Sequence, residues 1–271
     1  MHDRISVNSI CFLSRGFAEQ ASFWRSLAAD RISLVGPQLD AEGIENARAA
    51  LATGSYRLET IVHPFLPGKA LDPDEVSWEG PRAALSARIE LARQWGAKSV
   101  YMTTGGHGGL SWEQAASTFA AMVAPCAEQA RAAGIALMVE NAPPQYADLH
   151  IAHSLRDTVT LAELAGIGVC IDLFSCWTEA DLKNTIERAA TRCDLVQVSD
   201  YVCGDRALPA RAVPGDGDMP LQRLLGWILD AGFGGAFDLE LLGPRIDSEG
   251  QLAATDRAAR SVSALLERLG A

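Results

Sequence analysis

Apolar and polar residues follow a long-range alternation along the chain. Short runs rich in β-branched residues are each followed by an amphipathic stretch rich in Ala, Leu, Glu and Arg. This alternation predicts parallel βα units rather than a sandwich or a helical bundle. Eight apolar runs predict strands at residues 5–12, 31–38, 57–64, 98–104, 135–141, 167–174, 195–201 and 236–241. The stretches between and after them predict helices at 17–30, 41–53, 78–95, 112–133, 155–165, 179–193, 220–231 and 251–269.

Eight units in 271 residues give about 34 residues per unit, which suits a strand, a helix and two short loops. We therefore predict a single-domain (β/α)8 TIM barrel over residues 1–271. A doubly wound open sheet is the alternative. Against it, the glycine-rich segment 103–109 lacks both the dinucleotide fingerprint and the Lys-Ser/Thr ending of a phosphate loop, so a tight active-site loop is expected there.

Composition and charge narrow the class of partner. Hydrophobic residues make up 48% of the chain, enough for a large core. The formal net charge is −11, so no electrostatic footprint favours a nucleic acid or an anionic membrane surface. We expect a small-molecule substrate.

The chain offers no sign of export or of a disulfide framework. Residues 1–4 lack the basic and apolar pattern of a signal peptide, and no apolar run approaches the roughly 20 residues that a bilayer requires. The six cysteines form no CxxC pair, which indicates small buried apolar residues. A cytoplasmic location is expected.

Four successive predicted strands carry an acid or an amide near their carboxyl ends: Glu140, Asp172, Gln197 and Glu240. Barrel strands are normally apolar, and their carboxyl ends meet at the mouth where active sites form. Three carboxylates within about 4 Å would repel by roughly 4 kcal/mol per pair at an effective dielectric constant near 20. A divalent cation would relieve this repulsion, and the oxygen ligands favour Mn²⁺ or Mg²⁺ over zinc. The alternative is that each acid is a strand-end residue paired with an arginine or a helix N-terminus.

At these residues the chain resembles the xylose isomerase-like barrel superfamily of sugar phosphate isomerases and epimerases. The resemblance covers nearly the whole chain and is carried by Val139-Glu140-Asn141, Ile171-Asp172-Leu173-Phe174, the segment 211–218 and Leu239-Glu240-Leu241. It implies that Glu140 and Glu240 both ligate the metal and move protons on opposite faces of the substrate. Asp172 would be a third ligand.

Two positions depart from the usual pattern of that superfamily. Gln197 stands where the fourth ligand is usually a histidine, and some dehydratases of the group are similar in using Gln. Ser175, three residues after Asp172, replaces a second histidine. The endonuclease IV branch is excluded, because its site needs many more histidines and its substrate demands a basic face.

Further candidates follow other strand ends, where barrel enzymes collect substrate-binding groups. Arg211 matches an arginine that contacts substrate oxygens in ketose epimerases, and a guanidinium can grip a carboxylate, a phosphate or a vicinal diol. His63 and His107 are predicted to contact substrate or to shuttle protons. Trp177 is expected to form an apolar wall.

The predicted chemistry begins with the metal binding a ketone oxygen and an adjacent oxygen, which acidifies the proton on the intervening carbon. Glu140 or Glu240 then removes that proton to give a metal-stabilised enediolate. Return of a proton on the opposite face is epimerisation, and return at the neighbouring carbon is isomerisation.

Two other readings stay open. Loss of a β-hydroxyl would make the protein a lyase of the 3-dehydroshikimate or inosose dehydratase type, which Gln197 favours. A catalytically silent metabolite-binding barrel is the third reading, motivated by Ser175 and the missing metal histidine. Barrels of this family often pair, so a homo-oligomer is compatible with the sequence.

Overall fold

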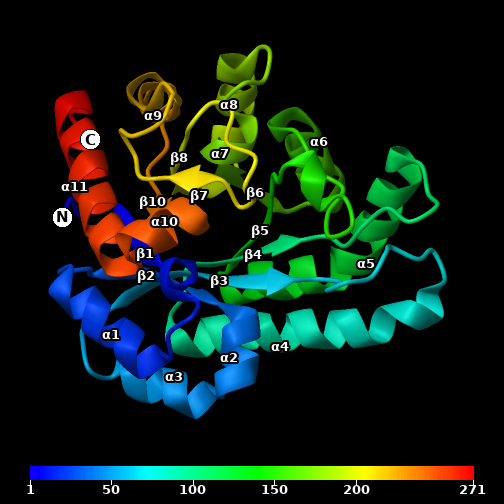
Figure 1. The fold of residues 1–271 in the computed structure, drawn as a ribbon. Coiled ribbons are helices and arrows are strands. Elements are labelled where there is room, and N and C mark those ends of the chain that lie inside the picture. Colours follow the sequence, from blue (N-terminus) through cyan, green and yellow to red (C-terminus); the bar gives the residue numbers. More distant parts are fainter.

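The computed structural model describes all 271 residues, and its centre is a closed barrel of parallel strands (Figure 1). Strands adjacent in the chain are neighbours in the barrel, which closes between the first strand and the last. The (β/α)8 prediction is thereby confirmed. The barrel strands are β1 (Ile5–Asn8), β2 (Arg31–Val35), β3 (Arg57–Pro64), β4 (Ser99–Thr103), β5 (Ala136–Glu140), β6 (Gly168–Asp172), β7 (Cys193–Val198) and β10 (Ala236–Leu239).

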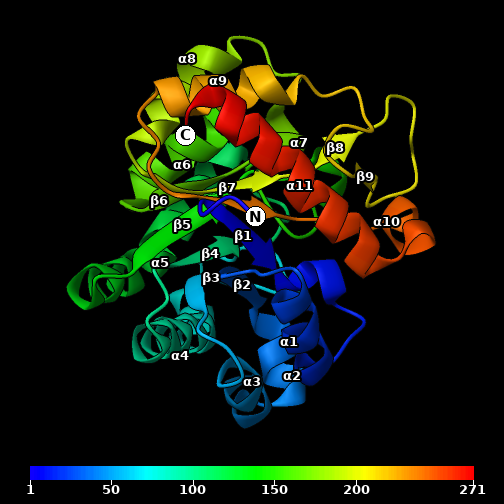
Figure 2. The same cartoon turned by 90° about the vertical axis from the view of Figure 1, so that its left-hand side faces the viewer.

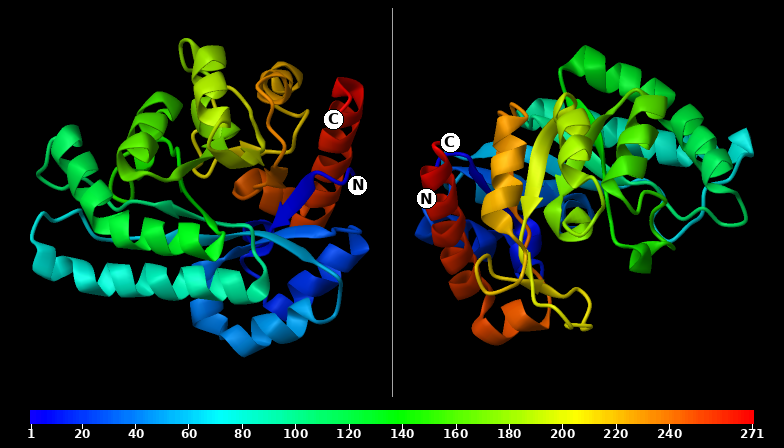
Figure 3. Two further views of the ribbon diagram at one scale, coloured as in Figure 1. Left: turned by 180° about the vertical axis from the view of Figure 1, so that it is seen from behind. Right: turned by 90° about the horizontal axis from the view of Figure 1, so that it is seen from above.

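Helices surround the strands on the outside, as the turned views also show (Figure 2, Figure 3). None of them is both long enough and apolar enough to cross a bilayer. The α-helices are α1 (Phe17–Ser26), α2 (Gly36–Glu42), α3 (Ile44–Leu51), α4 (Glu79–Trp95), α5 (Trp112–Ala133), α6 (Leu155–Ala165), α7 (Leu173–Cys176), α8 (Leu182–Ala190), α9 (Leu221–Asp230), α10 (Pro244–Glu249) and α11 (Gln251–Leu269). Three short 3-10 helices are η1 (Ser9–Phe12), η2 (Glu75–Trp78) and η3 (Pro144–Tyr146).

The longest helix shows why these segments start and stop where they do. At the start of α5, Ser111 accepts from the backbone N–H of Gln114, and the Gln114 side chain accepts from the backbone N–H of Ser111. This capping box satisfies two amides that would otherwise lack partners. The helix ends at Gly134, whose left-handed backbone (φ of 70°) is available to glycine at little steric cost.

The core has two layers. A cluster of 71 buried residues lies between the barrel and its helices, and a cluster of five lies among the strands: Tyr101, Met138, Cys170, Leu195 and Ala236. Alternate residues of a strand face the same side. The inward face that Met138, Cys170 and Leu195 define therefore continues, two residues further along, to Glu140, Asp172 and Gln197. Strand parity thus directs three of the four predicted ligands into the barrel mouth.

Most of the predicted strands end earlier than expected; β2, for example, ends at Val35 and not at residue 38, and the reason is visible at three other strand ends. β1 ends at Asn8, whose side-chain oxygen accepts from the Ile10 amide and begins η1. β6 ends at Asp172, which caps α7 in the same way through the Phe174 amide. The chain beyond β7 leaves the barrel as β8 (Asp200–Tyr201), which pairs antiparallel with β9 (Arg211–Ala212). Local capping by polar side chains overrides the apolar pattern at the ends of β1 and β6.

Candidate active site

The structure brings Glu140, Asp172, Gln197 and Glu240 together at the carboxyl ends of four adjacent strands. Glu140 and Asp172 are the last residues of β5 and β6, and Glu240 directly follows β10. Gln197 of β7 is paired in register with Asp172, and its amide donates a hydrogen bond to Glu240. These four side chains therefore lie together in the structure. Their role as metal ligands remains a prediction.

Arg211 lies among these acids and is buried. Its guanidinium reaches Asp172 with two bonds, Nη1 to Oδ1 at 3.1 Å and Nη2 to Oδ2 at 2.9 Å. Nη2 also lies 3.1 Å from Oε1 of Glu240, and Nη1 donates to the Ser199 hydroxyl at 3.1 Å. The forked geometry of arginine suits such paired contacts. Arg211 is thus the counter-ion of two carboxylates in this arrangement.

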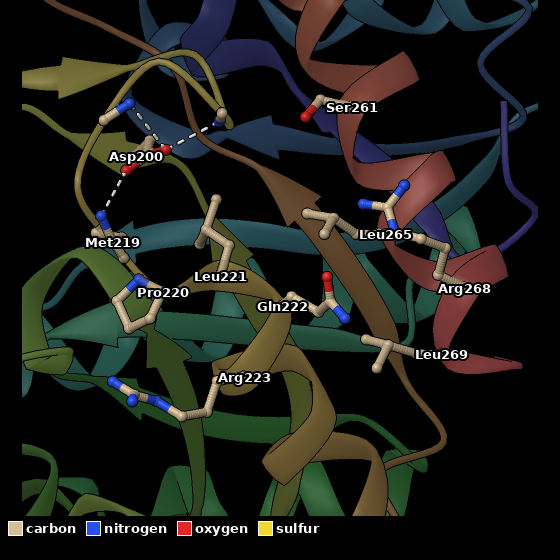
Figure 4. A pocket seen from close by; sticks show the side chains of 12 residues that line it. Asp200, Met219, Pro220, Leu221, Gln222, Arg223, Ser261, Leu265, Arg268 and Leu269 are labelled. Carbon is tan, nitrogen blue, oxygen red and sulfur yellow. Dashed lines mark hydrogen bonds between the residues drawn. The ribbon is translucent and has the colours of Figure 1, made fainter.

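The loop after β9 is fixed by a buried acid outside the barrel mouth. Asp200 accepts backbone N–H bonds from Gly215, Gly217 and Met219 at 2.9, 3.1 and 3.1 Å, drawn as dashed lines in Figure 4. A Cβ on Gly217 would lie 2.3 Å from Oδ1 of Asp200, so only glycine fits there. This clamp holds the segment that follows Arg211, and the β8–β9 pair holds Arg211 itself.

Burial sets the protonation chemistry of the two glutamates. Desolvation raises the pKa of Glu140 well above its usual value, and the charges of Glu240 and Asp172 raise it further. Desolvation also raises the pKa of Glu240, although Arg211 opposes the rise. For Arg211, burial favours the neutral form, but the two neighbouring carboxylates outweigh burial and raise its pKa. Two carboxyls with raised pKa values in one site are suited to exchanging protons near neutral pH.

The chemistry of the donor set fits a hard divalent ion. Three carboxylates supply oxygen ligands, and Oε1 of Gln197 is buried with no hydrogen-bond partner. An unsatisfied buried oxygen costs free energy unless a ligand or water pairs with it. The Gln197 amide nitrogen is held by the Tyr101 hydroxyl at 2.9 Å and by Glu240, which fixes the side chain. Oε1 is the atom that would contact an ion.

The side chains are arranged around a guanidinium and not around an ion. No three His, Cys, Asp or Glu side chains in the structure form a group that could hold a metal. Asp172 and Glu240 point their oxygens at Arg211 instead. Binding a metal would therefore require these carboxylates to change partners.

A cavity of about 330 Å³ adjoins this site and could take a small substrate. Ser175 joins the two, since its hydroxyl donates to Oδ2 of Asp172 at 2.5 Å and also lines the cavity. We call this space the substrate chamber; it is lined by Pro143, Gln145, Phe174, Ser175, Trp177, Tyr201, Asp205, Arg206, Leu208 and Ala210. Trp177 and Tyr201 pack against each other with ring centroids 6.4 Å apart. Trp177 therefore lines this cavity, and its predicted contact with substrate stays a prediction.

The two predicted histidines lie apart from the acids. Val62 packs against the cluster inside the barrel, so the next residue, His63, faces outward. It borders a cavity with Asp40 and Arg88 on the outer helices, and burial lowers its pKa to about 4. A substrate contact by His63 does not agree with this placement. His107 is exposed in the glycine-rich loop after β4, and its side chain makes no hydrogen bond with the site.

Several groups near the acids were not predicted from the sequence. Tyr101 of β4 and Ser199 after β7 contact Gln197 and Arg211. Tyr146 is half-buried beside the site; burial raises the pKa of its phenol, which Arg211 opposes and Glu240 reinforces. Inward strand parity was a usable signal for Tyr101 and Ser199. Tyr146 ends the three-residue 3-10 helix η3, which is too short to show a period in the sequence.

A second cavity, of about 630 Å³, lies between α9 and α11 (Figure 4). Its walls include Leu221, Gln222 and Arg268, and no acid of the barrel mouth borders it. It is larger than the substrate chamber and has titratable lining residues of its own, including Asp200. The substrate chamber is the cavity that Ser175 connects to Asp172, and we associate it with the acids for that reason.

The chain belongs to the xylose isomerase-like TIM barrel family, whose sequence model matches residues 19–267. No curated protein matches the chain. The resemblance to this family that the sequence predicted is thereby confirmed.

Three solved structures illustrate the similarity of fold. The IOLI protein with a bound zinc atom has a TM-score of 0.79 at 14% identity, with 98% of each chain covered. L-ribulose 3-epimerase has a TM-score of 0.77 at 17% identity, covering 98% of this chain and 95% of that one. A xylose isomerase-like barrel from Mycobacterium smegmatis in complex with magnesium has a TM-score of 0.73 at 17% identity, covering 99% and 98%. Divalent metals are thus bound by structural neighbours of the chain.

Proposed function

We propose that the protein is a divalent-metal-dependent isomerase or epimerase that moves a proton on the carbon next to a ketone, in a sugar-like or polyol-derived substrate. The observation that carries this proposal is the pair Glu140 and Glu240, a half-buried and a buried glutamate that lie at the same barrel mouth on either side of Gln197, whose Oε1 has no partner. The epimerase and the metal-bound barrels among the structural neighbours support it.

Glu140, Asp172, Gln197 and Glu240 would hold the ion. Their oxygens suit Mn²⁺ or Mg²⁺, and the unpartnered Oε1 of Gln197 is the fourth donor. When bound, the ion polarises the ketone and acidifies the neighbouring C–H bond.

The protein's own residues carry the proton. One glutamate carboxylate, Glu140 or Glu240, takes the proton from the carbon, and the electrons of the C–H bond form an enediolate. The other glutamate, as its acid, returns a proton to the opposite face in an epimerase; return at the adjacent carbon gives the isomerised product. Trp177 and Phe174 would support the carbon skeleton in the substrate chamber. Arg211 is proposed to contact substrate oxygens.

Dehydration is the second candidate, and two residues favour it. Gln197 and Ser175 stand where the family usually has histidines, and the Ser175 hydroxyl is already engaged by Asp172. The site near Ser175 therefore has no imidazole to relay a proton between neighbouring oxygens. After the same first proton transfer, a β-hydroxyl would leave as water with one proton supplied by a glutamic acid.

The test is to incubate the Mn²⁺-loaded protein with a panel of ketoses and cyclic hydroxy ketones in heavy water and to follow them by NMR. We expect deuterium at the carbon next to the ketone, with an isomer or epimer as product. A product lighter by one water selects the lyase. No exchange and no product across the panel, together with no thermal stabilisation by Mn²⁺ or Mg²⁺, would leave the catalytically silent barrel as the better description.

A further inference from the structure

We propose that Arg211 is a displaceable counter-cation: it neutralises Asp172 and Glu240 before a divalent ion binds, and it moves into the substrate chamber when the ion takes them over. This inference rests on the metal site of the proposed function. It goes beyond that function by assigning one side chain two successive partners.

Arg211 and the proposed ion compete for the same carboxylate oxygens. Arg211 engages both carboxylate oxygens of Asp172 and Oε1 of Glu240, all within 3.1 Å. These two acids are also proposed ligands of the ion. A guanidinium in contact with both would place a second positive charge within a few ångströms of a divalent ion, at a buried site where repulsion is weakly screened. The two cations therefore exclude each other.

Leaving these acids without any cation would cost free energy, whether the missing cation is Arg211 or the divalent ion. This cost explains the position of Arg211. Asp172 and Glu240 are both buried, and each of them contacts the guanidinium of Arg211. A buried carboxylate without a partner is strongly unfavourable. Arg211 supplies the compensating charge and so keeps the acids in place for the ion.

The displaced side chain also has a destination. The guanidinium of Arg211 lies over the Phe174 ring, 4.6 Å from its centroid, and Phe174 lines the substrate chamber. Ala210, the residue before Arg211, lines it too. The backbone of Arg211 is held in the β8–β9 pair, so rotation of the side chain is sufficient. In the chamber, the guanidinium would be free to bind substrate oxygens.

The experiment is calorimetric titration of the metal-free protein with Mn²⁺ at pH 8, comparing wild type with Arg211→Met and Arg211→Lys. We expect Arg211→Met to bind Mn²⁺ at least tenfold more tightly, because no cation must be displaced. Arg211→Lys, which keeps the charge without the fork, should stay closer to wild type. Thermal unfolding gives an independent readout: without Mn²⁺ the Met variant should melt below wild type, and it should gain more on adding Mn²⁺.

Arg88→Met is the matched control, because Arg88 is also a buried arginine bound twice to an acid, Asp40, but on the outer helices. Its Mn²⁺ affinity should equal that of wild type. If Arg211→Met shows native circular dichroism but unchanged or weaker Mn²⁺ binding, while Asp172→Asn loses binding, the displacement is wrong and the metal site stands. If neither wild type nor Arg211→Met binds Mn²⁺, both the displacement and the metal dependence of the proposed function fail.

Discussion

The two halves of the barrel mouth carry different kinds of residue. β1, β2, β3 and β4 end in Asn8, Val35, Pro64 and Thr103, none of which is ionisable. On the other half, β5 and β6 end in acids and a third acid follows β10. The histidine of this half, His63 of β3, borders a cavity on the outer helices and not the mouth. Charge is thus confined to one side of the mouth, where Arg211 and the substrate chamber adjoin it.

The largest expected effect is the loss of turnover when an acid of the charged half is neutralised. Glu140→Gln or Glu240→Gln should lower turnover by about 10³-fold, since positioned acid–base groups contribute roughly that much. Turnover of the substrate identified by the NMR panel checks this. The control is Glu249→Gln, which should leave turnover unchanged. Glu249 is an exposed acid at the end of α10 and is paired with Arg257 of α11. Retained activity in both site variants would mean that the base is misassigned.

Two equally buried carboxylates on the charged side should respond in opposite ways. Asp172 is paired with Arg211, so Asp172→Asn should destabilise the protein by about 3–5 kcal/mol by leaving a buried cation half-paired. Asp238 has only neutral partners, with bonds from Asn8 and Ser33 at 2.8 Å, and desolvation raises its pKa to about 6. Urea unfolding at pH 7.5 measures the free energy of unfolding of Asp172→Asn and of Asp238→Asn.

The sign for Asp238 follows from proton linkage. Its pKa in the folded protein is above the ordinary value of 3.8, so the folded state binds more protons between about pH 4 and pH 6. Stability is therefore lost as the pH rises through that window, up to about 3 kcal/mol. Asp238→Asn should remove this dependence and be neutral or stabilising at pH 7.5. A large destabilisation at pH 7.5 would show that Asp238 depends on its charge as Asp172 does.

Much of this arrangement is predictable from the sequence, and the exceptions have physical causes. The apolar alternation predicts all eight barrel strands, and Glu140, Asp172, Gln197 and Glu240 are recognisable as unusual strand ends. The outward direction of His63 was missed because strand position was read without strand parity. The contact of Arg211 with the acids depends on the β8–β9 pair and the Asp200 clamp, which join segments that no local pattern connects.

Two buried histidines, His63 and His150, should make stability depend on pH. Burial lowers the pKa of both His63 and His150 to about 4, from 6.5. The unfolded chain then binds more protons between pH 6.5 and 4, so stability is complete above 6.5 and falls as the pH drops through that range. His63→Leu should leave stability at pH 7.5 within about 1 kcal/mol and reduce this acid sensitivity, since its Nε2 has no partner.

His150 differs because both its ring nitrogens are bonded. Nδ1 accepts from the Thr104 amide at 3.0 Å, which leaves Nε2 to donate to the Glu140 carbonyl at 2.7 Å. His150→Leu should therefore cost about 2–3 kcal/mol at pH 7.5 by leaving two buried backbone groups unpaired. Urea unfolding at pH 7.5 and pH 5 tests the pair. Equal losses in the two variants would contradict the different roles assigned to these histidines.

The smallest expected effect is at the chamber wall. Trp177→Ala should raise KM by about tenfold and change kcat little, because an apolar wall contributes binding that is equal in the ground state and the transition state. Leu164→Ala, at an exposed residue of α6 remote from the chamber, is the control and should change neither constant. A fall in kcat with constant KM would assign Trp177 to the chemical step.

Deuterium exchange shows whether Glu140 and Glu240 move a proton on carbon. Wild type, each single glutamine variant and the double variant Glu140→Gln/Glu240→Gln would be incubated with Mn²⁺ and the same hydroxy ketone in heavy water. We expect deuterium at the carbon next to the ketone with wild type and none with the double variant. Exchange at the wild-type rate in the double variant would contradict this expectation.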